Sequence, residues 1–269
     1  MRGVRVVRFV GAVGVEKSDD LAVEDPLAML VTHGPPRDRR RTTLSVTMRT
    51  PGHDRDLAAG LLVAEGVVID PKDVLGVVPS RNGNAVRVEL HPAVVVDLTR
   101  LDRRGFTSSS CGVCGKTSLD AVETACDFLS RPGPVISAAV VHALSGRLRD
   151  AQPTFARTGG LHAAALFDPM GELLAVREDV GRHNAVDKLI GSEFLAGRLP
   201  LADRILFVSG RAGFELIQKA AVAGVAVFAA VGAPSSLAVE LAARVGMTLV
   251  GFVRDDRFNV YSTPGRIVG

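Results

Sequence analysis

The sequence contains few aromatic residues. It has no Trp, one Tyr and 11 Phe, and aromatic residues make up 4% of the 269 positions. Proteins that bind single-stranded nucleic acid stack the bases on aromatic side chains, so this composition argues against that class. Basic and acidic residues nearly balance, 32 against 29, and the basic residues are scattered along the chain. We therefore expect no nucleic-acid partner.

Long hydrophobic runs are also missing. The longest near-apolar run, 220–233, has 14 residues and includes two Gly, whereas a helix that crosses a bilayer needs roughly 20 apolar residues. The first ten residues alternate Arg with Val and lack the continuous apolar stretch of a secretion signal. We therefore expect a cytoplasmic protein without a membrane partner.

Cysteine is scarce, with three residues in the whole chain. An odd number of Cys in a chain of this length does not make a disulfide framework. Two of the three, Cys111 and Cys114, form a C-x-x-C pair. In a protein of the cytosol such a pair indicates redox, metal or sulfur chemistry. The pair is therefore the main functional signal of the sequence.

The region before the Cys pair, residues 1–107, is predicted to be a small α+β domain. Residues 43–48 are rich in Thr and Val, which favours a strand, and a second strand is expected before the charged segment 37–41. That charged segment is interpreted as a solvated loop. Leucines at helical spacing predict a helix over 54–66, with Asp54 as its cap and Gly66 at its end.

A hairpin is predicted at the end of this first domain. Two apolar alternating segments, 74–78 and 85–90, flank the dipeptide Asn82-Gly83. Asn and Gly readily adopt the positive φ angles of a tight turn, so the two segments should pair antiparallel.

The region after the Cys pair, residues 118–269, is predicted to be a three-layer α/β/α domain with a mixed sheet. It is expected to begin with helices near 120–129 and 140–148. Segments 161–167 and 172–176 flank an Asp-Pro-Met-Gly turn and should pair antiparallel.

Three short apolar segments follow: 205–208, 225–230 and 247–252. Helix-patterned stretches at 213–224 and 235–246 separate them. Continuous apolar strands that alternate with helices indicate a parallel sheet covered on both faces.

The carboxyl ends of these three strands are candidate ligand sites. Ligands of open α/β sheets bind where the loops after parallel strands meet. Exposed N–H groups at helix starts and Arg side chains bind phosphate, so a phosphate-bearing ligand is the natural occupant. The alternative is ordinary turns with solvated Arg. The candidate residues are Ser209, Gly210 and Arg211 after the first strand, Ser235 after the second, and Arg254, Asp255, Asp256 and Arg257 after the third.

Two further polar segments, 158–162 and 178–184, contain His162 and His183 beside glycines. Loops with so many polar residues often carry binding or catalytic residues. A lone His is nonetheless more often structural than catalytic, so both His residues are candidates only.

Small residues surround the Cys pair, which lies in Ser-Ser-Ser-Cys-Gly-Val-Cys-Gly-Lys at 108–116. We expect a mobile loop over 108–117, because Gly and Ser give a flexible chain. Lys116 and the helix start predicted after it favour a thiolate. A thiolate on a flexible tether suits a sulfur carrier, in which Cys111 or Cys114 holds a persulfide. Cys126 is expected to pack in the core.

Other readings of the Cys pair stay open. A thiol-disulfide oxidoreductase would use the same motif, but usually after the first strand of a βαβ unit. Structural zinc would need two more ligands at suitable spacing, and none is evident, so we expect no intrinsic metal. A nucleotide-binding module without catalysis would use the Ser and Arg residues and leave the cysteines idle.

Four motifs together resemble the formate dehydrogenase accessory sulfurtransferase family, and the resemblance runs almost from end to end of the chain. The motifs are Ser-Ser-Cys-Gly-Val-Cys-Gly-Lys at 109–116, Thr-Gly-Gly-Leu-His at 158–162, Glu-Asp-Val-Gly-Arg-His-Asn-Ala-Val-Asp-Lys at 178–188, and Ser209-Gly210-Arg211.

The resemblance implies a cytidine-deaminase-like C-terminal domain and a homodimer that takes sulfur from a cysteine desulfurase. It further implies that the sulfur passes to a molybdenum or tungsten bis-pterin guanine dinucleotide cofactor before that cofactor enters formate dehydrogenase. By position, Cys111 matches the persulfide carrier and Cys114 its accessory partner. Phe252, Val253 and the four residues up to Arg257 fall where the family binds the nucleotide part of the cofactor, and His183 lies in a family motif.

Overall fold

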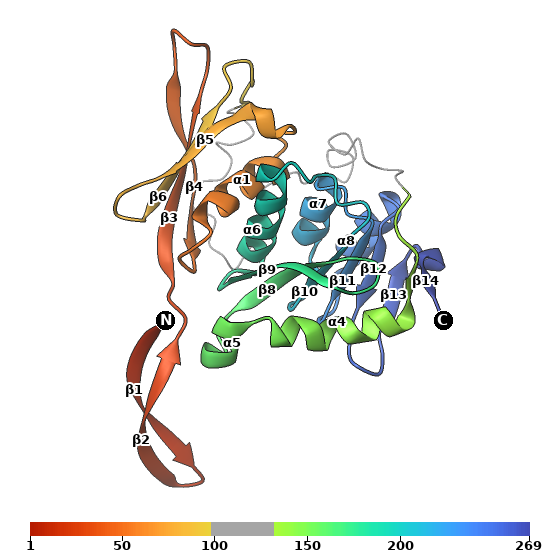
Figure 1. The fold of residues 1–269 in the computed structure, drawn as a ribbon. Helices are drawn as coiled ribbons and strands as arrows, with labels where there is room; N and C mark the ends of the chain where they lie inside the picture. The colour runs from red at the N-terminus through yellow and green to blue at the C-terminus, as the bar shows by residue number, and fades with distance from the viewer. Residues whose placement is uncertain (98–131) are drawn as a thin grey trace.

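The computed structural model describes residues 1–97 and 132–269 (Figure 1). The predicted loop 108–117 and the predicted helix near 120–129 lie outside these residues. The N-terminal part forms a two-stranded sheet, order β1-β2, and a four-stranded sheet, order β4-β3-β6-β5. Its elements are β1 (Arg2–Val10), β2 (Val13–Leu21), β3 (Asp25–His33), β4 (Arg40–Arg49), α1 (Asp54–Ala64), the short helix η1 (Pro71–Asp73), β5 (Val74–Pro79) and β6 (Ala85–Leu90).

The predicted hairpin is confirmed. β5 and β6 pair antiparallel, and Gly83 in the connecting turn has φ +74°. The helix after β4 is also confirmed, but its predicted cap is wrong. His53 occupies the cap position without a side-chain hydrogen bond, and Asp54 is the first helical residue. The Asp54 carboxylate instead binds the buried Arg49 guanidinium, with Nε to Oδ1 at 2.9 Å.

The charged segment 37–41 is only partly a solvated loop. Arg40 and Arg41 begin β4. Arg39 turns inward and donates hydrogen bonds to the carbonyl oxygens of Gly34, Thr32 and Leu90. This arginine joins the end of β3 to the end of β6, so it has a structural role that its charge alone did not indicate.

The C-terminal part contains a six-stranded mixed sheet of order β13-β12-β11-β10-β8-β9. As predicted, β10, β11 and β12 are parallel, and β8 and β9 pair antiparallel. A small parallel pair, β7 and β14, lies beside this sheet. The elements are β7 (Ile136–Ser137), α4 (Ala138–Asp150), α5 (Pro153–Thr158), β8 (His162–Phe167), β9 (Leu173–Asp179), α6 (Arg182–Leu195), β10 (Ile205–Val208), α7 (Phe214–Val222), β11 (Val227–Ala230), α8 (Ser236–Arg244), β12 (Thr248–Gly251), β13 (Asn259–Ser262), the short helix η3 (Pro264–Arg266) and β14 (Ile267–Val268).

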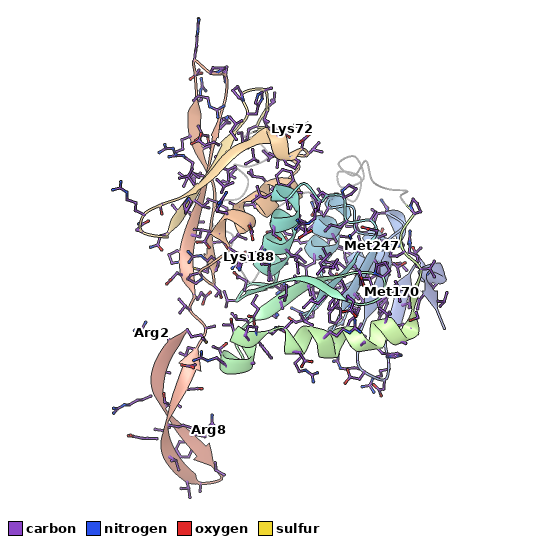
Figure 2. All side chains as sticks on the ribbon, in the orientation of Figure 1. Arg2, Arg8, Lys72, Met170, Lys188 and Met247 are labelled. Atoms are coloured by element: carbon purple, nitrogen blue, oxygen red, sulfur yellow. The ribbon has the colours of Figure 1, made fainter. Side chains whose placement is uncertain are left out.

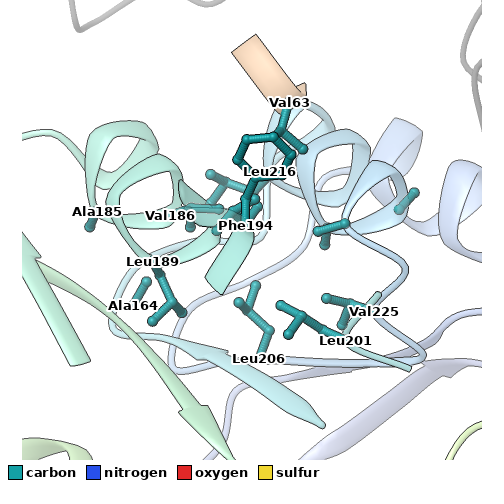
Figure 3. Close-up of a cluster of buried hydrophobic side chains, with 14 of the residues drawn as sticks. Val63, Ala164, Ala185, Val186, Leu189, Phe194, Leu201, Leu206, Leu216 and Val225 are labelled. Carbon is teal, nitrogen blue, oxygen red and sulfur yellow. The ribbon is translucent and has the colours of Figure 1, made fainter. Parts of the chain in front are cut away.

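Helices cover both faces of the six-stranded sheet, which confirms the three-layer prediction. Figure 1 shows α4 on one face and α6, α7 and α8 on the other. Alternate residues of β8 pack against the helices on opposite faces of the sheet, because successive side chains of a strand point to opposite faces. Ala163, Ala165 and Phe167 pack with α4, whereas Ala164 and Leu166 pack with α6 and α7. Figure 3 shows part of the second layer around Phe194, Leu206 and Leu216.

One apolar core runs from the four-stranded sheet to the six-stranded sheet through helices α1 and α6. Two glycines let these helices approach closely. A Cβ atom at Gly60 would lie 1.9 Å from the Asp187 carbonyl oxygen, and one at Gly191 would lie 1.9 Å from the Asp56 carbonyl oxygen. No side chain fits at either position, so the two glycines fix the contact between the two parts of the chain.

Helix α8 packs against the sheet over only part of its length. Leu237, Leu241 and Val245 of the α8 region share the spacing of a buried stripe, but Leu237 is 52% exposed. Leu237 lies in the first turn of α8, just after the Ser235 cap. The stripe therefore packs against the sheet only from Leu241 onward.

Candidate functional site

The loops that follow β10, β11 and β12 lie side by side. Backbone hydrogen bonds connect them, with Gly232 N–H donating to Gly210 O at 2.9 Å and Phe252 N–H donating to Gly232 O at 3.2 Å. A Cβ atom at Gly232 would be 2.9 Å from Gly210 O, so only Gly fits between the neighbouring loops. The predicted convergence of these loops is confirmed. We call residues 209–213, 231–235 and 252–257 the strand-end rim.

Ser209 and Ser235 of the rim both accept hydrogen bonds from backbone N–H groups. Ser209 Oγ accepts a hydrogen bond from Ala163 N–H at 2.9 Å, and Ser235 Oγ accepts one from Ala238 N–H at 3.3 Å as the cap of α8. Arg211 is exposed, and its guanidinium has no partner among the described residues. Arg211 is therefore the residue of this group that is free to bind an anion.

Residues 252–257 form a tight turn between β12 and β13. Phe252 has φ +54°, a left-handed conformation unusual for a non-Gly residue, and the residue is 41% exposed. Val253 is fully buried in the layer beneath α4, so its side chain cannot face a ligand. Backbone strain of this kind often occurs at binding sites, and here it presents an aromatic ring to solvent.

The charged residues of this turn differ in whether they are bound by other groups of the protein. Arg254 donates to the Val231 carbonyl oxygen at 2.8 Å, so it links two loops of the rim. Asp255 and Asp256 are exposed, and Arg257 Nη1 lies 3.7 Å from Asp256 Oδ2 in a largely exposed ion pair. Exposed ion pairs contribute little energy, so Arg257 remains available to a ligand.

Helices α6 and α7 carry two matched polar pairs. His183 Nε2 lies 3.1 Å from Glu215 Oε2. One turn further along both helices, Lys219 Nζ lies 2.7 Å from Asp187 Oδ1. We call these four residues the α6–α7 cluster. His183 was predicted from the sequence, whereas Glu215 and Lys219 were not. The repeated spacing of four residues on both helices was the available signal, because it places such side chains on one face.

His162, Arg182 and Gly210 lie next to this cluster. A Cβ atom at Gly210 would be 3.3 Å from His162 Nδ1 and 3.8 Å from Arg182 Cδ. Arg182 and His162 are half-buried, and neither has a hydrogen-bond partner among the described residues. The end of β10 therefore joins the strand-end rim to the start of α6. Arg182 was not predicted as a site residue.

Burial controls the protonation of the cluster. Burial, with smaller contributions from the nearby Lys219, Arg182 and His162, lowers the pKa of His183 to about 3. Burial and Arg182 also lower the pKa of His162. Both imidazoles are therefore neutral at pH 7, so the contact between His183 and Glu215 is not an ion pair at that pH. Burial raises the pKa of Asp187 to about 6, although Lys219 opposes that shift.

The start of α6 is fixed by a buried ion pair. Lys188 Nζ lies 2.6 Å from Asp179 Oδ2, and it also donates to the Thr50 carbonyl oxygen at 2.8 Å. Asp179 further accepts hydrogen bonds from the N–H groups of Thr50 and Gly181 and from the Asn184 amide. Asp179 belongs to β9, not to the polar loop that the sequence predicted. This network ties the end of β4 to the site.

The two cysteines of the predicted carrier loop, Cys111 and Cys114, lie outside the described residues. Within the described ranges, no helix has the length and apolar character needed to cross a membrane. The described part of the site consists of the rim, the α6–α7 cluster and the Arg182–His162 pair between them. Its free cationic groups, Arg182, Arg211 and Arg257, can bind an anionic ligand.

Comparisons with known proteins cover nearly the whole chain. The chain is 47% identical over 273 residues to "Sulfur carrier protein FdhD" of Streptomyces avermitilis, which covers 98% of this chain and 94% of that protein. It is 48% identical over 265 residues to the protein of the same name from Mycobacterium tuberculosis, with 94% and 93% covered.

A solved structure and a family model agree with these relatives. The crystal structure of a putative formate dehydrogenase accessory protein from Desulfotalea psychrophila matches with a TM-score of 0.75 at 22% identity, covering 99% of both chains, which shows a shared fold. Residues 22–268 match the FdhD/NarQ family model. This chain therefore belongs to the FdhD/NarQ family.

Proposed function

We propose that this chain is a sulfur carrier that supports the maturation of a formate dehydrogenase. The observation that carries the proposal is its 47–48% identity, over more than nine tenths of its length, to proteins named sulfur carrier protein FdhD. The sequence supplies the chemical group that such a carrier needs, the pair Cys111 and Cys114.

In this proposal Cys111 receives sulfane sulfur from a cysteine desulfurase and holds it as a persulfide. Transfer follows the exchange chemistry of disulfides. The acceptor supplies the electron pair for its new bond to the outer sulfur. The S–S bond breaks, and its electron pair remains on Cys111 as a thiolate. Cys114 is the accessory thiol, able to attack or protect the first sulfur.

The acceptor in this proposal is a molybdenum or tungsten bis-pterin guanine dinucleotide cofactor, which is a substrate and not a resident group. The strand-end rim supports such a ligand. It combines free arginines, Arg211 and Arg257, with the exposed ring of Phe252. Guanidinium groups bind phosphates in bidentate fashion, and an aromatic ring can stack on a base. Asp255 and Asp256 lie beside these groups. Their carboxylates would repel an anionic ligand unless they turn toward solvent.

The α6–α7 cluster has a supporting part in the proposal. His183 is neutral at pH 7 and is held by Glu215. A neutral imidazole next to the rim adds no positive charge, and it offers one donor and one acceptor. We assign it the task of orienting polar groups of the ligand at the end of β10, where Gly210 and His162 lie beside Arg182.

Mass spectrometry of the intact protein tests the carrier role. The protein is incubated with a cysteine desulfurase and cysteine and compared with the variants Cys111→Ala and Cys114→Ala. We expect a gain of about 32 Da, one sulfur atom, that disappears in Cys111→Ala and persists in Cys114→Ala. The variant Cys126→Ala is the matched control and should gain the same mass as the wild type. Absence of the gain in every variant, with an active desulfurase, would reject the carrier role.

A further inference from the structure

The turn at 252–257 exposes some of its residues and uses others to attach itself to the protein. Phe252 and Arg257 are exposed, whereas Val253 is fully buried. On the side of the parallel strands, Phe252 N–H donates to Gly232 O at 3.2 Å. Val253 N–H donates to Ala230 O at 3.1 Å. These two bonds fix the start of the turn, but they do not involve Arg257 at its far end.

The far end of the turn is closed on itself. Arg254 N–H donates to the Arg257 carbonyl oxygen at 2.8 Å, with Asp255 and Asp256 between them. The two arginines are therefore held opposite each other across a tight loop. A contact that fixes the backbone of Arg254 also places the backbone of Arg257.

Helix α4 supplies such a contact through one side chain. His142 Nδ1 lies 3.2 Å from the Arg254 carbonyl oxygen. The His142 ring also lies against the Phe258 ring, with centroids 4.9 Å apart and planes tilted by 56°. His142 thus touches the residue at the start of the closed loop and the residue just after it. Helix α4 covers the face of the sheet opposite α6, α7 and α8 (Figure 1), so His142 approaches the turn from the other layer.

The chemistry of this contact fixes its direction. A backbone carbonyl oxygen can only accept a hydrogen bond, so Nδ1 of His142 must carry the proton. The neutral tautomer protonated at Nδ1 and the imidazolium both have this donor. The tilted arrangement with Phe258 is a favourable geometry for two aromatic rings. The two contacts differ in kind, so separate substitutions can remove either one.

The turn needs such support because its backbone is strained. Phe252 has φ +54°, and a non-Gly residue keeps a left-handed conformation only where the surrounding structure holds it. The parallel strands hold one side of the turn, and His142 holds the other. If the turn leaves this conformation for part of the time, a ligand that needs it binds more weakly in proportion to the fraction lost.

We propose that His142 is a positioning residue for nucleotide binding at the strand-end rim. By its hydrogen bond to the Arg254 carbonyl oxygen it holds the turn in the conformation that presents Phe252 and Arg257 to the ligand. His142 itself touches no ligand and acts only through the turn. This inference rests on the proposed function, in which the rim binds the nucleotide part of the cofactor.

Three substitutions at His142 separate the hydrogen bond from the ring contact. His142→Ala removes both. His142→Phe keeps a ring against Phe258 without a donor, and His142→Asn keeps an N–H donor at about the same distance along the side chain without a ring. Isothermal titration calorimetry with GDP measures the affinity. We expect binding to weaken about two- to tenfold in His142→Ala and His142→Phe, the range for the loss of one hydrogen bond, and His142→Asn to stay within about twofold of the wild type.

A second histidine gives a matched control. His91 also makes one side-chain hydrogen bond to the backbone, accepting from Ala93 N–H at 3.2 Å, but it lies just after β6 in the N-terminal part. His91→Ala should bind GDP as the wild type does. Urea denaturation verifies that every variant is folded.

Hydrogen exchange without GDP examines the turn independently of binding. The N–H groups of Phe252, Val253 and Arg254 all donate hydrogen bonds in this structure. These amides should exchange faster in His142→Ala and His142→Phe than in the wild type and in His142→Asn, whereas the amides of β10 should not change. The expected pattern would show that the hydrogen bond of His142 holds the turn.

The possible outcomes separate this inference from the proposed function. A wild-type protein that binds no GDP would reject the nucleotide site of the proposed function, and this inference with it. A wild type that binds GDP, with equal affinity in His142→Ala, overturns this inference alone. Rescue by His142→Phe but not by His142→Asn also overturns it, because ring packing and not the hydrogen bond would then set the affinity. Unchanged exchange of the turn amides in His142→Ala has the same consequence.

Discussion

The start of α6 and the strand-end rim are adjacent regions of one domain, but their polar side chains are held in different ways. At the start of α6, Asp179 and Lys188 are almost fully buried, and the Asp179 carboxylate is bound by Lys188, by the N–H groups of Thr50 and Gly181, and by the Asn184 amide. On the rim, Arg211 has no partner among the described residues, and Arg257 has only a solvated one.

This difference separates structural from binding roles. Buried polar groups are costly unless they are paired, so the network at α6 must be complete for the protein to fold. Exposed arginines without strong partners contribute little to the free energy of unfolding. They can bind a ligand without first breaking a stabilising ion pair. The two regions should therefore respond in opposite ways to substitution: the first in stability, the second in binding.

The largest effect is expected at Lys188. Lys188→Met removes the cation and leaves the Asp179 carboxylate buried, so unfolding should become easier by about 3–5 kcal/mol. Denaturation by urea at pH 7 measures this change. The control is Lys72→Met, since Lys72 is exposed (Figure 2) and its loss should change stability by less than about 0.5 kcal/mol. Similar stability of the two variants would show that the buried pair is not essential.

The α6–α7 cluster predicts two opposing effects of pH on stability. The folded-state pKa of His183, about 3, lies below its ordinary value of 6.5, so the unfolded chain binds the extra proton between these values and stability rises with pH. The folded-state pKa of Asp187, about 6, lies above its ordinary value of 3.8, so the folded chain binds the extra proton there and stability falls with pH. The two contributions oppose each other between about pH 4 and pH 6.

Single variants separate the two effects. Relative to wild type, Asp187→Asn should make the slope of stability against pH more positive over pH 4–6, and His183→Asn should make it more negative. Each change approaches at most about 1.4 kcal/mol per pH unit, the value for one proton. Urea denaturation at four or five pH values gives the slopes. Slopes unchanged from wild type in both variants would mean that the cluster titrates normally.

The sequence predicted most of the fold because its signals were local. The Asn82-Gly83 turn and the apolar strands β10, β11 and β12 were recognised from periodicity and turn residues. The carboxyl ends of parallel strands meet at one edge of a sheet, so the rim also followed from the order of elements.

Contacts between distant segments were not predictable in this way. Glu215 and Lys219 look like ordinary surface residues in the sequence of α7, and only the packing of α7 against α6 brings them beside His183 and Asp187. The contribution of Thr50 to the Asp179 network depends on the approach of α1 and α6 at Gly60 and Gly191. Val253 shows the opposite error, since a motif placed it in the site while its side chain belongs to the core.

The smallest effect on stability, and the most specific effect on binding, is expected on the rim. Arg211→Ala/Arg257→Ala removes two free cations, so unfolding should change by less than about 0.5 kcal/mol. Binding of GDP, used as a probe for the nucleotide part of the proposed cofactor, should weaken about tenfold or more, because a hydrogen bond to a charged group contributes roughly 1.5–3 kcal/mol net. Isothermal titration calorimetry measures the affinity, and Arg37→Ala/Arg149→Ala, two exposed arginines away from the rim, is the control. If both double variants bind GDP equally well, the free arginines of the rim are surface residues like any others, and the contrast with the α6 network does not extend to binding.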